Sequence, residues 1–231
     1  MPIFLSKRQP DLIEFMDRED CDPVLLENTY RQFATINLLL SQWKRIYKNE
    51  LLPMMQEGIT YTLLDIGFGG GDVPIRLAEW AEKDGINLII TAIDTDKRAY
   101  NFAQKLYSHP RVTFRHCASS DLVSDSVSFG FVISNHVLHH LPENQMQKFL
   151  EETKSLADQK VIFNDIERSD IGYALFTTFA RMLFRKSFIV ADGLISIQRS
   201  YTKSELEKTV PKEWKVKKVF PFRLLLKYGR S

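Results

Sequence analysis

Cysteine and long apolar runs are both scarce in this chain. Its 231 residues include two cysteines, and Cys21 and Cys117 stand in no metal-binding or redox spacing. The first residues, MPIFLSKRQPD, have neither the basic start nor the apolar run of a signal peptide. No segment approaches the roughly 18 uninterrupted apolar residues of a membrane span. We therefore expect a protein of the reducing cytoplasm, with no transmembrane segment and no metal site.

An excess of one charge is also lacking. The chain carries 31 basic and 29 acidic side chains, a net charge of +2. This small net charge does not indicate an extended nucleic-acid-binding surface. Residues 212–230 are locally basic, and lysines that guard a sheet edge explain this stretch better than a phosphate-binding patch. We therefore expect no nucleic-acid partner. The length and the hydrophobic content of 44% predict one domain with a full core.

Short apolar runs alternate with amphipathic helical stretches after residue 60. Strands are expected at 62–66, 88–94, 112–116, 129–134 and 160–165, with helices at 73–83, 97–107 and 143–156 between them. Unbroken apolar strands separated by such helices predict an α/β fold with a parallel sheet covered on both faces. Residues 214–220 and 223–229 are expected to add a terminal antiparallel pair, which makes a mostly parallel sheet of seven strands.

The rest of the chain divides around this core. We expect a single domain made of an N-terminal helical cap (1–60), a cofactor-binding core (61–165), a substrate-side insertion (166–200), and a terminal helix with a β-hairpin (201–231). Within the insertion, an apolar helix at 171–184 precedes a stretch through Ser200 without a clear pattern. Thr202 and Glu205 then have the spacing of a capping box at the start of a helix.

Glycine is rare except at one place, since four of the ten glycines fall within residues 67–71. This stretch follows the first strand, where open α/β sheets bind ligands, and glycine lets the backbone approach a ligand closely. A dinucleotide site would have a third glycine where Asp72 stands, and the Gly-Lys-Ser/Thr of a phosphate-binding P-loop is missing. Asp65 and Asp72 would repel a pyrophosphate. They suit a ligand with a cationic ammonium or sulfonium end.

The stretch DIGFGGGD, residues 65–72, resembles motif I of the class I S-adenosylmethionine-dependent methyltransferases. Asp94, at the end of the second strand, matches the family's acid that accepts hydrogen bonds from both ribose hydroxyls. Residues 129–142, FGFVISNHVLHHLP, are similar to the fourth-strand segment of the small-molecule methyltransferases. The resemblance covers residues 60–165. It implies a Rossmann-like fold, S-adenosylmethionine as cofactor and S-adenosylhomocysteine as product.

The resemblance also implies which residues hold the cofactor. These are Asp65, Gly67, Phe68, Gly69, Gly71, Asp94, Thr95, Ala118, Ser119, Asn135 and His136. The family's usual acid after the third strand is absent near Cys117 and Ala118, so we expect backbone groups with Ser119 or Asp121 to contact the adenine. Gly130 stands in place of the usual aspartate before the fourth strand.

Methyl transfer is an in-line displacement that depends mainly on holding the acceptor atom about 3 Å from the methyl group. For a phenol, a base that takes the proton helps. His136 is a candidate for that base, although a backbone contact to the cofactor or a loop hydrogen bond is an alternative. The resemblance makes His140 a buried structural residue.

Polar residues around the insertion are the other candidates. Asp165 and Arg168 are candidate catalytic residues, and Asp165, Arg168, Asp192, Ser196 and Arg199 form a candidate substrate-binding set. The alternative is that two Asp–Arg pairs lock the insertion onto the sheet. Aromatic side chains of the insertion line an apolar cavity if it forms a lid, or pack as an ordinary helix face. Asn37, polar within an apolar helical run, is placed to cover the cofactor.

The flanks resemble a bacterial methyltransferase subgroup through EFMD (14–17), DIER (165–168) and DGLISIQR (192–199). Some members are encoded beside polyketide-type synthases, which points to phenolic or quinone-like acceptors. The sequence thus predicts methyl transfer to a small aromatic, quinone-like or lipid-like molecule. One alternative, an NAD(P)-dependent oxidoreductase, is disfavoured by Asp72 and by the missing Tyr-x-x-x-Lys. The other is a non-catalytic protein that binds S-adenosylmethionine or S-adenosylhomocysteine.

Overall fold

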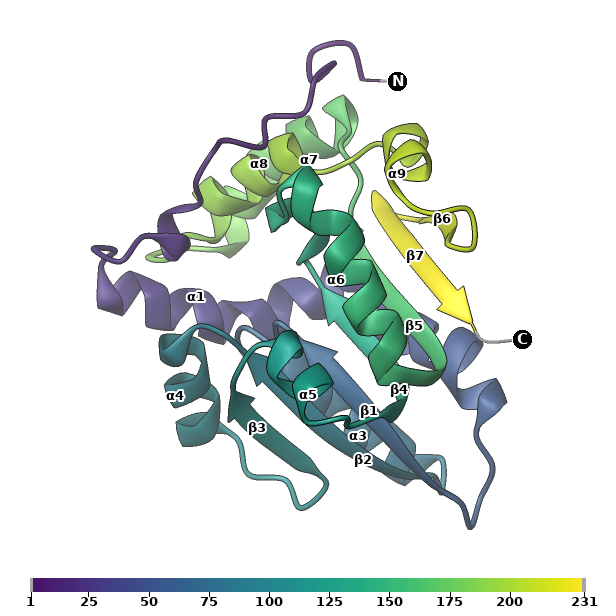
Figure 1. Ribbon diagram of the computed structural model, residues 1–231. Coiled ribbons are helices and arrows are strands. Elements are labelled where there is room, and N and C mark those ends of the chain that lie inside the picture. The colour runs from purple at the N-terminus through teal and green to yellow at the C-terminus, as the bar shows by residue number, and fades with distance from the viewer. Residues whose placement is uncertain (1, 230–231) are drawn as a thin grey trace.

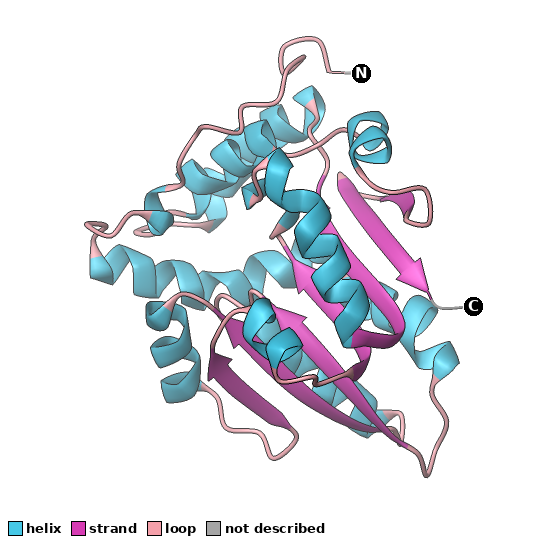
Figure 2. Cartoon of the chain, viewed as in Figure 1, coloured by secondary structure: helices cyan, strands magenta, loops and turns pink. Residues whose placement is uncertain are grey.

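The computed structural model describes residues 2–229, so that Met1, Arg230 and Ser231, including the last arginine of the basic stretch, lie outside the described part. The described chain builds one seven-stranded sheet with helices on both faces (Figures 1 and 2). The strands are β1 (Thr60–Ile66), β2 (Asn87–Asp94), β3 (Val112–His116), β4 (Phe129–Asn135), β5 (Ala157–Ile166), β6 (Lys215–Val219) and β7 (Arg223–Gly229). Their order is β3-β2-β1-β4-β5-β7-β6.

Strands β1 to β5 pair in parallel, and β7 runs antiparallel to both β5 and β6. The predicted Rossmann-like fold, mostly parallel with an antiparallel end, is therefore confirmed. Strand β6 forms one edge, where Lys215, Lys217 and Lys218 are exposed. Charged lysines on an edge strand discourage pairing with another sheet, as the basic stretch predicted.

The helices fill the connections between strands and flank the sheet. They are α1 (Pro23–Ile36), α2 (Trp43–Ile46), α3 (Asp72–Lys83), α4 (Lys97–Leu106), α5 (Ser119–Ser124), α6 (Glu143–Leu156), α7 (Asp170–Leu183), α8 (Ile189–Arg199) and α9 (Lys203–Thr209). Successive strand residues point to opposite faces, so each continuous apolar run feeds two cores. Leu63 packs with α2 and α3 on one face, whereas Leu64 packs with α6 on the other.

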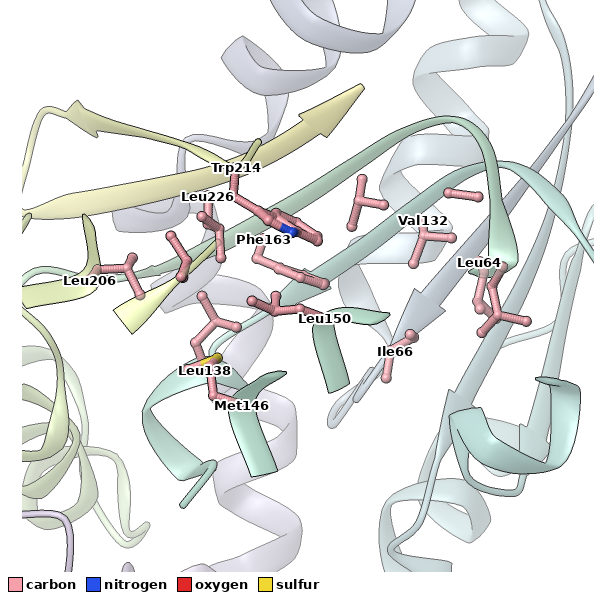
Figure 3. Packing of buried hydrophobic residues seen from close by; sticks show 14 of the residues in the cluster. Leu64, Ile66, Val132, Leu138, Met146, Leu150, Phe163, Leu206, Trp214 and Leu226 are labelled. Carbon is pink, nitrogen blue, oxygen red and sulfur yellow. The ribbon is translucent and has the colours of Figure 1, made fainter. Parts of the chain in front are cut away.

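The core under α6 and α9 is shown in Figure 3. The rings of Phe163 and Trp214 stack with their centroids 5.7 Å apart, which joins β5 to the segment before β6. Leu150 and Met146 of α6 belong to the same core cluster, and both are fully buried. Aromatic pairs of this kind add about 0.5–1.5 kcal/mol beyond their buried area. This packing fixes the antiparallel end of the sheet against β5.

The N-terminal helical region begins where the sequence predicts. The Asp22 side chain accepts hydrogen bonds from the amides of Val24 and Leu25, and Pro23 occupies the first position of α1. The helical run is interrupted at Gln42, which has a left-handed φ of 58°. In Figure 1, α1 crosses near the arrowhead ends of β1 and β2.

The insertion contains two helices. The expectation of an unpatterned stretch before Ser200 was wrong, because residues 189–199 form α8. The buried face of α8 combines Ile189 and Ile197 with the polar residues Asp192, Ser196 and Arg199, so polar side chains stand where a helix core face is usually apolar. After it, Thr202 and Glu205 form the predicted capping box of α9. Within residues 2–229, the chain has no helix with the length and apolar character to cross a membrane.

Candidate functional site

A cavity of about 840 Å³ opens at the carboxyl ends of the strands. Its walls include the loops that follow β1, β2 and β4, together with residues of α1, α7, α8 and the N-terminal segment. The chain order in the sheet reverses between β1 and β4, because β2 lies on one side of β1 and β4 on the other. Such a switch point leaves a crevice in which open α/β sheets bind their ligands.

The glycine loop after β1 has two different sides. Gly67, Gly69 and Gly71 all have left-handed φ angles, of 75°, 53° and 80°. Gly67 and Gly69 line the cavity. Gly71 does not, and a Cβ built on it would lie 3.1 Å from the side chains of Ala103 and Phe114. Gly71 therefore packs the loop against α4 and β3.

Asp94 stands beside this loop at the end of β2. Its Oδ2 accepts a hydrogen bond from the Gly69 amide, and its Oδ1 accepts one from the Asp96 amide, both at 2.9 Å. Each carboxylate oxygen can accept two hydrogen bonds, so Asp94 keeps one acceptor position on each oxygen. Asp94 and Thr95 both line the cavity. This fits a ligand with two adjacent hydroxyl groups.

Asp65 is the most unusual charge at the site. It is 1% exposed, and neither of its side-chain oxygens has a hydrogen-bond partner among the described residues. Burial, with Asp72 and Asp94 nearby, raises the pKa of Asp65 well above its usual value. A buried and unpaired carboxylate at a cavity wall is stabilised by a cation. Asp65 thus suits a ligand with a positively charged end.

A chain of polar side chains runs from α1 to the end of the sheet. The Asn37 amide group donates to Asp72 at 2.9 Å, and Asn135 donates to the Asn37 oxygen at 3.1 Å. Arg223 of β7 donates in turn to the Asn135 oxygen at 3.1 Å and contacts the Nε2 atom of His136. The network therefore places Asn37, Asn135 and His136 together at the cavity, where all three were expected.

His136 has a left-handed φ of 64°, and its ring lies against Arg223. Burial and the Arg223 guanidinium hold the pKa of His136 well below its usual value. The ring is therefore neutral, its Nε2 accepts from Arg223, and Nδ1 carries the proton. A ring in this state presents a donor, which does not suit the predicted role of general base.

The residues after β3 line the part of the cavity expected for an adenine. Ala118 and Ser119 are at the wall, and so is Phe68 of the glycine loop after β1. The Ser119 hydroxyl donates to Glu152 at 3.0 Å. The Asp121 carboxylate accepts from the Ala118 amide at 2.9 Å, which caps α5 and keeps Asp121 away from the cavity.

Asp165 does not line the cavity, but it positions a residue that does. Its Oδ1 lies 2.6 Å from Nδ1 of His139, and its Oδ2 accepts from the His139 amide at 3.0 Å. Burial alone would lower the pKa of His139, but Asp165 and Glu14 raise it to about 9. His139 is the buried member of the histidine pair, whereas His140 keeps 30% of its side chain exposed. The expectation that His140 is buried was wrong.

The structure places Arg168 away from the cavity. Its guanidinium donates to the carbonyl oxygens of Leu5 and Ser200 at 2.9 and 2.7 Å, and it pairs with Glu205. The side chain is fully buried by these partners. The arrangement gives Arg168 the function of tying the N-terminal segment to the chain between α8 and α9.

Asp192 and Ser196 line the cavity from α8, and Arg199 lies behind them. Asp192 accepts from the amides of Phe15 and Met16 at 2.7 and 3.1 Å, and burial raises its pKa to about 7. Among the described residues, neither of the two expected Asp–Arg pairs forms. The polar face of α8 contacts residues 14–17 instead.

Glu14 is the residue that sequence reasoning missed at this site. It is 4% exposed, lines the cavity, and accepts from the Ser196 hydroxyl at 2.8 Å. Arg199 lies 3.8 Å from the same carboxylate. The EFMD stretch, which contains both Glu14 and Asp17, was the sequence signal that could have identified Glu14.

Comparison with known proteins places this architecture in a class. Residues 63–160, less than half of the chain, match the family described as "Methyltransferase domain". No protein with a curated description matches the chain.

Several solved structures share the fold. A SAM-dependent methyltransferase from Aquifex aeolicus is 17% identical, with a TM-score of 0.58 over 89% of this chain and 97% of that one. A magnesium protoporphyrin IX methyltransferase from Synechocystis PCC 6803, crystallised with S-adenosylhomocysteine, is 14% identical, with a TM-score of 0.53 over 94% and 91%. A plantazolicin methyltransferase in complex with a substrate analogue is 12% identical, with a TM-score of 0.57 over 87% and 86%.

Residues 63–160 thus match a methyltransferase domain, and the sheet order shared with these solved structures is that of the class I methyltransferase fold. The methyl donor of this class is S-adenosylmethionine. Solved structures of the same fold hold the product, S-adenosylhomocysteine.

Proposed function

We propose that this protein transfers a methyl group from S-adenosylmethionine to a small aromatic, phenolic, quinone-like or lipid-like acceptor. The observation that carries the proposal is the buried carboxylate of Asp65, which has no hydrogen-bond partner within residues 2–229 and lies next to the glycine loop, in a cavity that Asp94 also lines. A cationic ligand with vicinal hydroxyls satisfies both carboxylates at once.

Different residues of the cavity contact different parts of S-adenosylmethionine in this proposal. The backbone of Gly67 and Gly69 allows close approach of the ligand, and Asp94 accepts hydrogen bonds from ribose hydroxyls. Asp65 faces the positive end, while Phe68, Ala118 and Ser119 surround the adenine. When bound, S-adenosylmethionine supplies an electrophilic methyl group for in-line displacement.

The other part of the cavity is apolar and is where we place the acceptor. Phe176, Phe179 and Phe184 of the insertion line it, and so do Leu175 and Leu183. Leu183 and Phe179 are also 63% and 56% exposed, which makes an apolar rim through which a hydrophobic molecule can enter. A lined cavity of this kind favours a small acceptor over a folded protein or a duplex.

The resemblance of the flanks to the bacterial subgroup encoded near polyketide-type synthases supports the same acceptor class. Residues 14–17, 165–168 and 192–199 carry that resemblance. Residues 14–17 and 192–199 contact each other at the cavity, and Asp165 is linked to Glu14 through His139. Their arrangement supports a role for these motifs in shaping the acceptor side.

Calorimetric titration with S-adenosylmethionine, S-adenosylhomocysteine and NADH in parallel tests the proposal. Micromolar binding of the first two alone supports it and justifies a screen of phenolic and quinol acceptors. Binding of NADH alone would favour the oxidoreductase alternative. Cofactor binding without turnover of any acceptor in the screen would favour a non-catalytic binding protein.

A further inference from the structure

Three side chains that are far apart in the sequence converge on one point of the cavity wall. Oε1 of Glu14 lies 3.4 Å from Nε2 of His139 and 3.6 Å from Nε2 of His140. One potential ligand atom from each of the three residues lies within 4.8 Å of the others. Two donor atoms bound at about 2.1 Å to a tetrahedral ion lie about 3.4 Å apart. The observed spacing therefore fits one metal ion between the three groups.

Both imidazole rings are turned so that Nε2 faces Glu14. Nδ1 of His139 lies 2.6 Å from Asp165, and Nδ1 of His140 lies 3.4 Å from Asp17. A carboxylate on the far nitrogen is the usual way in which proteins orient a metal-binding histidine. The buried Nε2 of His139 makes no well-aligned hydrogen bond within residues 2–229, since Glu14 at 3.4 Å is an ion-pair contact only. This atom is nearly inaccessible to water and is aimed at the point of convergence.

The charges in contact with this cluster leave room for a divalent cation. Glu14, Asp17 and Asp165 contribute three negative charges, and Arg199 contributes one positive charge at 3.8 and 3.7 Å from Glu14 and Asp17. Arg8 contributes a second positive charge, because it donates to the His139 carbonyl oxygen at 3.1 Å, so with neutral imidazole rings the group carries an excess of one negative charge. A bound cation offsets this excess.

We propose that Glu14, His139 and His140 bind a divalent transition-metal ion, with zinc as the best match to two nitrogen ligands and one oxygen ligand. Three protein ligands leave a coordination position open, and all three residues line the cavity. An acceptor hydroxyl or carboxylate can occupy that position. A bound hydroxyl then loses its proton to solvent more readily, which favours hydroxyl-bearing acceptors such as phenols and enols.

Ion binding is independent of the proposed function, and only the role toward the acceptor rests on it. The test uses the full chain, stripped with a chelator and titrated with Zn²⁺ by calorimetry and with Co²⁺ by visible absorption. We expect one equivalent to bind the wild type, with Co²⁺ bands typical of a four- or five-coordinate site. His140→Ala should weaken binding roughly 100-fold or more. Asp17→Asn should weaken it roughly 10- to 100-fold, because it removes the outer partner of His140.

His109→Ala is the matched control. His109 lies outside the cavity, so this substitution should leave the affinity for Zn²⁺ unchanged. Thermal unfolding and S-adenosylmethionine titration of the same variants establish that they are folded. A wild-type protein that binds neither ion stoichiometrically overturns the metal site, and so does equal affinity in His140→Ala. Zinc binding without S-adenosylmethionine binding supports the metal site and rejects the proposed function alone.

Discussion

Nη1 of Arg223 lies 2.8 Å from Nε2 of His136, so a fixed guanidinium occupies the nitrogen that a general base would need. Arg223 is itself 3% exposed and also donates to Asn164 and Asn135. Burial lowers the pKa of Arg223 to about 10, which still leaves it charged at neutral pH. The permanent charge beside His136 opposes a second positive charge on the ring.

His136→Asn should therefore reduce turnover by about tenfold or less, because only a hydrogen bond is lost. Asparagine tolerates the left-handed φ of 64° at this position. Loss of a general base typically costs a factor of about 100 to 10,000. The measurement is kcat and its pH profile for wild type and variant with an accepted phenol. A loss of 1,000-fold, together with the disappearance of an ionisation in the profile, would restore the base assignment.

The fold was predictable because the strand signal is strong. Each central strand is buried on both faces, so its middle is a continuous apolar run, as in residues 129–133 and 161–163. The carboxyl ends of parallel strands meet at one edge, which explains why Asp65, Gly67 and Asp94 could be assigned to a common cavity without knowledge of their contacts.

The other side of the cavity could not be predicted in the same way. The polar face of α8 is buried because residues 14–17 supply its partners, and such a long-range pairing leaves no local pattern. Which of the two histidines, His139 or His140, is buried depends on the direction of the short 3-10 turn Leu138–His140. Sequence spacing does not fix that direction. Arg168 resembled a substrate ligand because its buried carbonyl partners at Leu5 and Ser200 are backbone atoms and carry no sequence signature.

Asp94→Ala should weaken S-adenosylmethionine binding by about 2 kcal/mol or more, because paired hydrogen bonds to a buried ligand are lost. This corresponds to a roughly 30-fold higher Kd. Asp94 also holds the Gly69 amide, so thermal unfolding of the variant must be measured beside the titration. Asp125→Ala, at an exposed position after α5, is the matched control. An unchanged Kd in Asp94→Ala would remove Asp94 from the ribose site.

Arg168→Met should destabilise the protein by about 3–5 kcal/mol, because it leaves the carbonyl oxygens of Leu5 and Ser200 and the Glu205 carboxylate without their donor. Urea unfolding monitored by tryptophan fluorescence measures this loss. Arg181→Met replaces an exposed arginine of the same insertion and should change the stability by less than about 0.5 kcal/mol. If Arg168→Met instead kept full stability and raised the KM for the acceptor, Arg168 would be a substrate ligand.

Asp65→Asn should separate stability from cofactor binding. The folded protein raises the pKa of Asp65 above the value of about 4 in the unfolded chain, so protonated Asp65 favours folding. The stabilising contribution is present below about pH 4 and is lost as the pH rises through the pKa of the folded state. At neutral pH, in the absence of ligand, Asp65→Asn should therefore unfold at a higher temperature than the wild type. The same variant should bind S-adenosylmethionine more weakly, because the cation loses its carboxylate partner.

Thermal unfolding from pH 4 to pH 8, with and without S-adenosylmethionine, measures both effects. The wild type should lose stability with rising pH without ligand and gain more from the ligand at high pH. Both trends should be weaker in Asp65→Asn, where Asp192, whose pKa is also raised, still contributes to the first. If Asp65→Asn were less stable than the wild type at neutral pH but bound the ligand equally well, Asp65 would be a structural carboxylate with no part in holding the cation.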